Sequence, residues 1–360
     1  MEATPGMMNV DQRWSQQGVS GSSYSFHSAS ELSQLFHLVG KRFDALQLTP
    51  GRLKGEMSIA QLGAVTLLKI TTTHRILLNG DRGPDCISFC IEASGQAKDH
   101  KVFCVPMSAY SVHGFKQGLL ESHFELSADS TTYLTITSSR RFNDYLEHFG
   151  LESMIGEMEM SNSLQSFPLM HQHMAKEFEF LIQNSFVNTI RPQQAGHRLY
   201  GLFVKCLTCH DEEGCFIPMV STPRQELVRR LIGWGFLHGT ADTNLDQICQ
   251  MLFASKGTLI QSTKEALDIG PMELLKRIRL EKVNGMLRSQ ERRKTAQLTT
   301  VSEVAQYFGF RSRGHFARAY QELFSESPSV TLSKARSRTT QVIHGLNSRH
   351  PGSTTGDPRP

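Results

Sequence analysis

Short apolar runs separated by turn residues fill the region from about Leu48 to Ser138. The runs are rich in β-branched and aromatic residues, and turn signals such as Asn79-Gly80 lie between them. Because short strands at regular spacing pair with one another, the pattern predicts a small antiparallel barrel or sandwich. The predicted strands are 64–71, 75–78, 86–91, 101–105, 123–126 and 133–137.

The apolar spacing then changes to that of helices. Amphipathic segments run from about residue 169 to 187 and from 197 to 210, and residues 244–332 have a helical pattern throughout. Thr222 followed by Pro223 is typical of an N-cap and the first residue of a helix. The second half of the chain is therefore predicted to be helical.

An internal repeat lies in this helical half. Residues 245–271 and 301–328 can be laid over each other, and each predicts a short helix, a tight turn, an N-capping serine and a second helix. In the second copy Gly309 is expected to supply the left-handed turn position, and Ser312 to cap the following helix. The predicted core of the two units comprises Leu259, Phe316, Tyr320 and Leu323.

The second copy resembles the signature of the AraC/XylS family of transcription regulators. The resemblance covers roughly residues 245–332, a quarter of the chain, and implies two helix-turn-helix units joined by a long helix that begins at Pro271. The residues that carry it are Val304-Ala305, Gly309-Phe310, Phe316-Ala317-Arg318, Tyr320 and 324–328.

The two copies depart from that signature at several positions. Gln261 and Thr263 stand where the family favours an arginine and a large apolar residue. Asp268 and Ser325 replace the glycine that usually precedes the closing proline of each unit. These departures concern the packing and binding of the first unit more than the family resemblance.

The outer face of each second helix is the surface that a DNA major groove would meet. Arg313 could fork onto guanine and Gln261 could pair with adenine, whereas Arg318 and Lys264 are expected to contact phosphates. His315 is expected to lie nearer the packed side and to be structural. The predicted DNA-binding residues are Lys256, Gly257, Gln261, Lys264, Arg311, Arg313, Gly314, Ala317, Arg318 and Gln321.

The predicted connecting helix sets the distance between the two units. A helix of about 18 residues spans roughly 27 Å, which is of the same order as the ~34 Å between successive major grooves on one DNA face. One chain would therefore read a single asymmetric site with two elements. Gly257, Gly314 and Ala317 are small enough to let the helices approach the base edges closely.

The charge distribution agrees with a polyanion-binding C-terminal part. Ala241 to Arg338 carries 16 Lys and Arg against 10 Asp and Glu, a balance of +6, whereas the whole chain carries +4, so the remainder is −2. The 39% hydrophobic and 20% charged residues are typical of a soluble globular protein. We find no apolar run long enough for a membrane span and no secretory signal. A cytoplasmic, nucleoid-associated location is expected.

The strand-rich half resembles, in the order of its elements, the cupin-like ligand-binding domain common in this family, with a helical dimerisation segment. The resemblance implies that an unidentified small-molecule or protein effector binds there, although a barrel that only mediates protein contacts is the alternative. Metal-binding cupins need paired His with a Glu at close spacing, and His74, His100, His113 and His123 show no such cluster. Neither a metal nor a cofactor is predicted.

Two alternative functions depend on cysteine. Cys206-Leu-Thr-Cys209-His210 has the spacing of a haem-attachment motif, but that chemistry belongs to exported chains. With Cys215 nearby, a redox- or metal-sensing regulator stays open, as does a DNA-targeted enzyme of the alkyl-acceptor repair type. No acceptor motif surrounds these cysteines, so no catalytic residue is predicted.

The sequence as a whole predicts an α+β, non-enzymatic regulator that binds promoter DNA as a homodimer. We expect an activator that also contacts RNA polymerase. The expected fold joins a cupin-like antiparallel β-barrel with a helical dimerisation segment to an all-α domain of two helix-turn-helix units. The expected boundaries are a disordered arm over 1–28, an effector-binding and dimerisation domain over 29–220, the DNA-binding domain over 221–335 and a disordered tail over 336–360.

Overall fold

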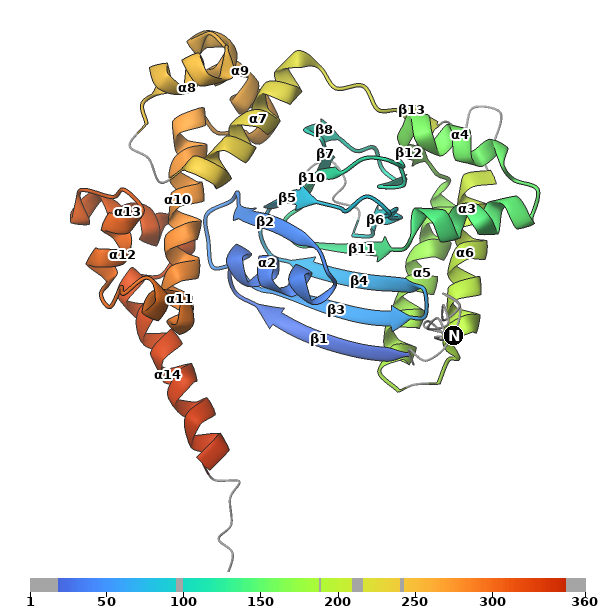
Figure 1. The fold of residues 1–360 in the computed structure, drawn as a ribbon, viewed down its shortest axis with the longest axis horizontal. Coiled ribbons are helices and arrows are strands. Elements are labelled where there is room, and N and C mark those ends of the chain that lie inside the picture. The colour runs from blue at the N-terminus through green and yellow to red at the C-terminus, as the bar shows by residue number, and fades with distance from the viewer. Residues whose placement is uncertain (1–18, 95–99, 188, 209–215, 240–242, 348–360) are drawn as a thin grey trace, which may run out of the picture.

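Two antiparallel sheets occupy the centre of the computed structural model, which describes residues 19–94, 100–187, 189–208, 216–239 and 243–347 (Figure 1). In the described residues the larger sheet has eight strands in the order β1-β3-β4-β11-β6-β9-β12-β13, and the smaller has five in the order β2-β5-β10-β7-β8. The strands are β1 Ser20–Phe26, β2 Arg42–Gln47, β3 Gly55–Leu62, β4 Val65–Thr72, β5 Ile76–Asp81, β6 Cys90–Glu92, β7 Lys101–Val102, β8 Val105–Pro106, β9 Ser111–His113, β10 Glu121–Leu126, β11 Ser130–Ile136, β12 Ser161–Gln165 and β13 Phe216–Pro218.

The predicted β-rich N-terminal half and helical C-terminal half are confirmed, but the sheets do not close into one barrel. Instead the two sheets share an apolar core, because strands of each turn alternate side chains toward the other. Met57 and Ile70 of the larger sheet and Leu78 and Phe124 of the smaller sheet belong to that core.

The residues expected to form a disordered arm include a strand, so that prediction was wrong for Ser20–Phe26. These residues form β1, which pairs antiparallel with β3 along its whole length. The Ser-rich composition of this segment suggested disorder, but the strand is ordered by its backbone hydrogen bonds to β3 and by close packing. A Cβ on Gly21 would lie 2.5 Å from Ser185 Oγ, so only glycine lets β1 lie against this neighbour.

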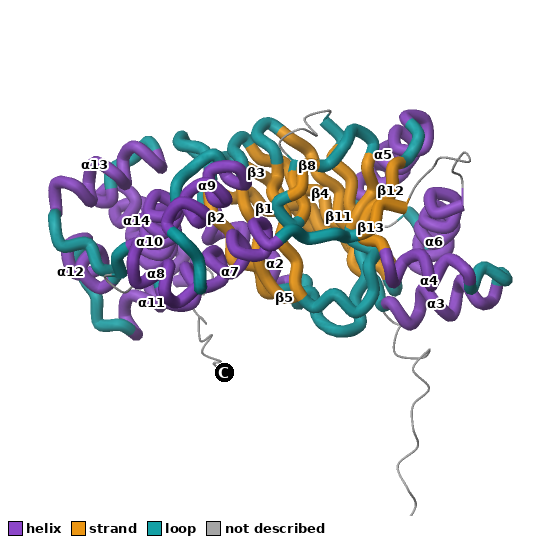
Figure 2. Tube along the Cα trace, turned by 90° about the horizontal axis from the view of Figure 1, so that it is seen from above, coloured by secondary structure: helices purple, strands orange, loops and turns teal. Residues whose placement is uncertain are grey.

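The helices cover the sheets from two sides, as both views show (Figures 1 and 2). The group α3–α6 lies on one side and the C-terminal group α7–α14 on the other, with α2 between β1 and β2 in sequence. No described helix combines the length and apolar character needed to cross a bilayer. The helices are α2 Ala29–Leu38, α3 Ser139–His148, α4 Ser153–Met160, α5 Pro168–Ser185, α6 Pro192–Thr208, α7 Pro223–His238, α8 Leu245–Leu252, α9 Lys256–Leu267, α10 Pro271–Arg288, α11 Gln290–Thr295, α12 Val301–Tyr307, α13 Arg313–Phe324 and α14 Pro328–Asn347.

The last helix runs through part of the expected disordered tail. α14 continues past Arg336 to Asn347, so this part of the prediction was also wrong. Leu332 and Ala335 on its first turns are buried, which anchors a segment whose Ser-, Thr- and Arg-rich composition resembles that of a tail. The remainder of the expected tail lies outside the described residues.

The helical and β-rich parts contact each other along α10 and the end of α9. Gly285 on α10 packs on Ser30 of α2, where an added Cβ would lie 3.1 Å from the Ser30 Cβ. Arg288 pairs with Glu31 at 3.0 Å. Arg277 donates to the Leu48 carbonyl at the end of β2. The C-terminal helical half is therefore docked on the sheets in this structure.

A second set of contacts joins the end of α9 to the smaller sheet. Asp268 Oδ2 accepts from Arg75 Nη1 at 2.8 Å, and Arg75 Nη2 reaches the buried Glu125 at 2.7 Å. Lys101 of β7 donates to the Ala266 carbonyl. We call the contacts of Arg75 and Lys101 with Ala266 and Asp268 the α9 latch.

Candidate nucleic-acid interface

The first helix-turn-helix unit consists of α8 and α9, as the repeat predicted. Asn244 closes a capping box at the start of α8. Ser255 accepts the Thr258 backbone N–H at the start of α9, and Leu259 is fully buried. The turn position is taken by Phe253, which adopts a left-handed φ of 52°. The predicted cap and core of this unit are confirmed.

The second unit consists of α12 and α13 and repeats the same construction. Thr300 forms a capping box with Glu303, and Ser312 accepts the His315 backbone N–H. Gly309 has the predicted positive φ, at 82°. Phe316 and Leu323 are buried, as predicted.

Tyr320 joins this unit to the connecting helix. Its ring is fully buried, its hydroxyl accepts from Asn284 Nδ2 of α10 at 2.8 Å, and it donates to Thr331 Oγ1 of α14 at 2.9 Å. Burial raises the pKa of the Tyr320 phenol, so the group stays protonated and can serve both bonds. Two helices, α10 and α14, are thereby joined to α13.

Asp268 and Ser325, which replace the glycine expected at the ends of α9 and α13, keep the backbone conformation that glycine would adopt there. Asp268 ends α9 with φ 64° and Ser325 ends α13 with φ 52°, both in the left-handed region. Each donates its backbone N–H to the preceding turn, so the helix end is satisfied. Thr263, which replaces a large apolar residue, is buried and donates to the Leu259 carbonyl at 2.7 Å.

The connecting helix α10 contains 18 residues, the predicted length, which corresponds to roughly 27 Å. It begins at Pro271, directly after the first unit, and α12 and α13 follow its C-terminal end (Figure 1). Its buried residues include Leu274 and Ile278 toward the first unit and Val283 and Leu287 toward the second.

All ten predicted DNA-binding residues are exposed. Some already have partners: Lys256 pairs with Asp246 at 2.5 Å, and Gln261 donates to Glu265 at 2.8 Å. A Cβ added at Gly314 would meet no atom within 4 Å, so this face of α13 is open. Contact of any of these residues with DNA stays a prediction.

His315 was expected nearer the packed side, and this prediction was wrong. The residue is exposed on the first turn of α13, beside Arg313 and Gly314. The buried residues of α13 begin only at Phe316, one position after His315. His315 thus joins the residues that α13 can present to a ligand.

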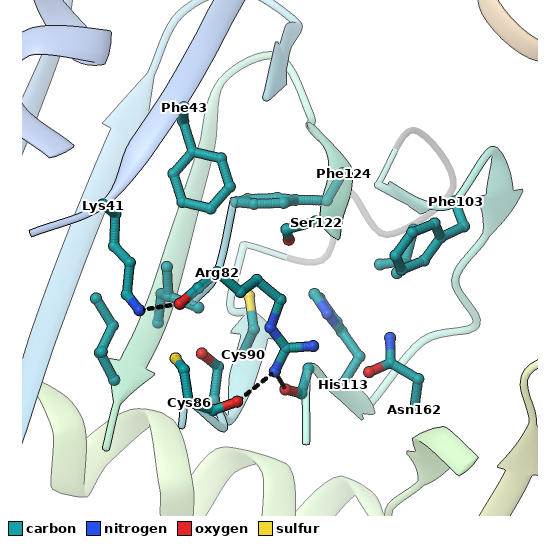
Figure 3. Close-up of a pocket in the computed structure, with 15 residues that line it drawn as sticks. Lys41, Phe43, Arg82, Cys86, Cys90, Phe103, His113, Ser122, Phe124 and Asn162 are labelled. Atoms are coloured by element: carbon teal, nitrogen blue, oxygen red, sulfur yellow. Dashed lines mark hydrogen bonds between the residues drawn. The ribbon is translucent and has the colours of Figure 1, made fainter. Parts of the chain in front are cut away.

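A cavity lies between the two sheets, in the part expected to bind an effector (Figure 3). The space between its lining side chains is about 490 Å³ with its open mouth included, but its enclosed part has room for little more than water. The walls are mostly apolar, and two cations, Arg82 and Lys41, face it. Apolar lining residues include Phe43, Phe124, Leu134 and Ile136.

Arg82 is buried without a carboxylate partner among the described residues. Its guanidinium donates to the carbonyls of Cys86 and Gly114, while Lys41 donates to the Arg82 carbonyl. Burial lowers the pKa of Arg82, but an arginine stays charged at neutral pH. Figure 3 shows the guanidinium close to His113 and Cys90. The cavity therefore holds an uncompensated positive charge.

The fold also brings together three residues that the sequence search did not connect. Cys90, His100 and His113 are buried, and their donor atoms all lie within 4.8 Å of one another. His100 Nε2 and His113 Nε2 are 2.8 Å apart. The pattern of paired His with a Glu that is typical of metal-binding cupins does not include a cysteine, so Cys90 was not considered. The antiparallel pairing of β6 with β9, which sets Cys90 opposite His113, was the missing signal.

The cysteines of the alternative functions are only partly described. Cys206 of α6 is buried in the core, whereas Cys209, His210 and Cys215 lie outside the described residues. The other described cysteines, such as Cys104 and Cys249, are buried free thiols.

The comparisons with known proteins concern the C-terminal part. A family profile described as a helix-turn-helix domain matches residues 248–334. The XylDLEGF operon transcriptional activator 2 of Pseudomonas putida is 30% identical over 90 residues, which are 25% of this chain and 55% of that protein. The transcriptional activator RhaS of Escherichia coli O157:H7 is 28% identical over 98 residues, 27% of this chain and 33% of that protein.

The matches thus span about a third to about half of the length of these curated relatives. Among solved structures, a probable AraC family transcriptional regulator from Rhodopseudomonas palustris is 26% identical and covers 31% of this chain and 97% of its own, with a TM-score of 0.27. Because this TM-score is low, the structural likeness carries no weight. The assignment of the C-terminal part as a helix-turn-helix domain rests on the sequence matches.

Proposed function

We propose that this chain, which belongs to the AraC/XylS family of transcription regulators by its C-terminal tandem helix-turn-helix domain, binds promoter DNA through α9 and α13. The observation that carries the proposal is the repeated construction of two capped helices with an open outer face, joined by α10. The domain boundaries proposed are 29–220 for effector binding and dimerisation and 221–335 for DNA binding.

The exposed residues of α9 and α13 fall into two groups, those that can contact base edges and those that can contact phosphates. Arg313 on the first turn of α13 can reach a guanine edge, and Gln261 on α9 can pair with adenine if it leaves Glu265. Arg318 and Lys264 lie further along their helices, where phosphates pass. Gly257 and Gly314 leave room for the groove wall. Arg311, Ala317, Gln321 and Lys256 complete the proposed surface.

We also propose that the cavity binds a small organic anion with an apolar body. Arg82 and Lys41 offer the positive charge, and phenylalanine rings surround them. Because the present space admits little more than water, binding would require the lining side chains to move apart. The β7–β8 hairpin contributes Val102 to the cavity wall and Lys101 to the α9 latch. An effector that moves the hairpin would therefore change how α9 is held.

The chain is proposed to act as a homodimer and as an activator that contacts RNA polymerase. Support for the dimer comes from exposed apolar side chains on and beside α5: Leu169 is 80% exposed and Phe186 is 45% exposed. The activator role is what the two curated relatives are named for, and here it is a proposal.

The experiment that tests DNA binding begins with selection of fragments from the host's genomic DNA by the full chain. Affinities for a selected site and for random duplex are then measured for the wild type, Arg313→Ala and Arg318→Ala. Arg140→Ala, an exposed arginine of α3, is the charge-matched control.

Arg313→Ala should weaken the selected site by ~1–3 kcal/mol and random DNA much less, with relaxed preference at one base pair. Arg318→Ala should weaken both and reduce the salt slope by about 0.9. Equal affinity of the wild type for selected and random DNA would contradict the proposal.

The effector proposal is tested separately, by thermal unfolding with pairs of aromatic or aliphatic carboxylates and their uncharged amides. The carboxylate of a binding pair should raise the melting temperature of the wild type more than its amide does, and Lys41→Met should reduce the difference. Equal shifts for the acid and the amide would show that the cations do not select the ligand.

A further inference from the structure

A buried set of one thiol and two imidazoles lies where the two sheets meet. Cys90 of β6 and His113 of β9 face each other across one antiparallel pair of the larger sheet. His100 directly precedes β7 of the smaller sheet, and its carbonyl accepts the Met107 backbone N–H, which closes the β7–β8 hairpin. The side chains of all three residues converge from fixed backbone positions.

From this geometry we propose that Cys90, His100 and His113 form a binding site for one Zn²⁺ ion, or a similar thiophilic divalent cation, which joins the two sheets. Sulfur and imidazole nitrogen are the donors that zinc prefers, and no carboxylate belongs to the set. Nothing in the DNA-binding function requires these residues.

The distances fit such an ion after a small adjustment. Zn–S of about 2.3 Å and Zn–N of about 2.0–2.1 Å in a tetrahedron place donor atoms roughly 3.3–3.6 Å apart. The donor atoms here lie within 4.8 Å of one another, and the two Nε2 atoms are 2.8 Å apart. For the ion to bind, the two Nε2 atoms must therefore separate by about half an ångström, and donor atoms as far as 4.8 Å apart must approach each other by about 1 Å.

The protonation states suit coordination. Burial lowers the pKa of His100 to about 4 and the pKa of His113 also, so both imidazoles are neutral and offer a lone pair. The Cys90 thiol is protonated in this environment, because burial raises its pKa. Binding of the cation as Zn²⁺ would release that proton to solvent and leave a zinc thiolate.

A hydrogen-bonded histidine pair is the simpler explanation of the same contact, but it leaves the place of the Cys90 sulfur unexplained. The sulfur is not needed for a histidine pair, yet it lies within 4.8 Å of a donor nitrogen of each ring. Three protein ligands leave the fourth position of a tetrahedral zinc site open. Because Cys90 and His113 line the cavity, a water molecule or an atom of an effector in the cavity can fill that position.

The metal content of the purified full chain tests the site. Because Cys206, Cys209 and Cys215 could bind metal on their own, the test background carries all three as serine. This chain is saturated with Zn²⁺ and dialysed, and its zinc is counted per chain. It is also loaded with Co²⁺, whose thiolate complexes show a charge-transfer absorption in the near ultraviolet. Both readouts are independent of DNA binding.

The variants are Cys90→Ser, His100→Gln and His113→Gln, and Cys86→Ser is the matched control. Cys86 is a buried cysteine that lines the same cavity but is not part of the set. We expect one Zn²⁺ per chain and the cobalt–thiolate band in the background and in Cys86→Ser. Cys90→Ser should lose the band. Each ligand variant should weaken Zn²⁺ binding by more than the roughly 10–100-fold that loss of an outer-shell partner costs.

Thermal unfolding of the background chain with and without Zn²⁺ keeps the test informative if a variant fails to fold, since Zn²⁺ should raise its melting temperature. Absence of bound Zn²⁺ and of any melting shift in the background chain would overturn the proposal. A cobalt–thiolate band that survives Cys90→Ser would do the same.

Discussion

Replacing Glu281 by glutamine is expected to stabilise the docked arrangement of the two halves at neutral pH. Glu281 on α10 is only 4% exposed and lies against α2 and the end of β2. Burial raises the pKa of its carboxyl to about 8, although the Arg288 charge and the backbone of Gln47 partly oppose the shift. At pH 7 the carboxyl is therefore mostly protonated in the folded chain but ionised in the unfolded chain.

The size of the effect follows from the two pKa values. The ordinary pKa of a glutamate is 4.5, and the pKa of Glu281 in the folded chain is about 8. Between these two pH values the folded state holds more protons than the unfolded state, so the free energy of unfolding falls by up to about 1.4 kcal/mol for each unit by which the pH rises. At pH 7 the protonation of Glu281 lowers the free energy of unfolding by roughly 3 kcal/mol, and at pH 4.5 the loss is near zero. Glutamine does not titrate, so the Glu281→Gln chain should be more stable than the wild type at pH 7 by about that amount.

Urea unfolding at several values between pH 5 and pH 8 measures this difference. Trp234 on α7 reports on the helical half by fluorescence, and Glu291→Gln, an exposed change on α11, is the control. The advantage of Glu281→Gln over the wild type should grow with pH, and Glu291→Gln should show no such growth. A stability difference that is constant across this range, or a Glu281→Gln chain that is less stable at pH 7, would mean that the Glu281 carboxyl is not held protonated by burial.

Three further changes probe other parts of the structure. Tyr320→Phe removes the hydroxyl between Asn284 and Thr331 and leaves buried polar groups unpaired, so the free energy of unfolding should fall by about 1–3 kcal/mol, measured by denaturant titration; an unchanged value would mean that the hydroxyl is dispensable. Asp268→Asn, which still tolerates the left-handed backbone at the end of α9, should weaken the α9 latch by removing the carboxylate from Arg75 and Lys101, at a cost below about 1 kcal/mol because that carboxylate is 66% exposed. Since its partners lower the Asp268 pKa, that contribution should be present above pH 3.8 and disappear as the pH falls, and a contribution retained in acid would argue against the latch. Gly314→Leu should leave the melting temperature within a few degrees of the wild type but weaken binding to a selected site at least tenfold, and unchanged affinity would place α13 outside the groove.

The C-terminal half could be predicted from the sequence because its signals are local. Capping serines, a turn glycine and apolar residues one helical turn apart specify each unit within a short stretch of chain. Ser255, Gly309 and Ser312 therefore take the predicted places, and Leu259 and Phe316 are buried as predicted.

The N-terminal half was less predictable because its order depends on partners distant in sequence. Ser20–Phe26 has little apolar content of its own and becomes a strand only beside β3. The proposed metal set likewise forms only when strand pairing sets Cys90 opposite His113 and the second sheet brings His100 to them. Periodicity does not reveal which strands become neighbours.

If α9 and α13 enter successive major grooves of one DNA face, hydroxyl-radical footprinting of the full chain on a selected site will show it. We expect two protected segments on the same face, separated by about one helical turn of ~10–10.5 base pairs. Changes in α9, such as Gly257→Leu, should erase one segment, and Gly314→Leu in α13 should erase the other. A single protected segment, or loss of both segments from either change alone with the fold intact, would contradict it.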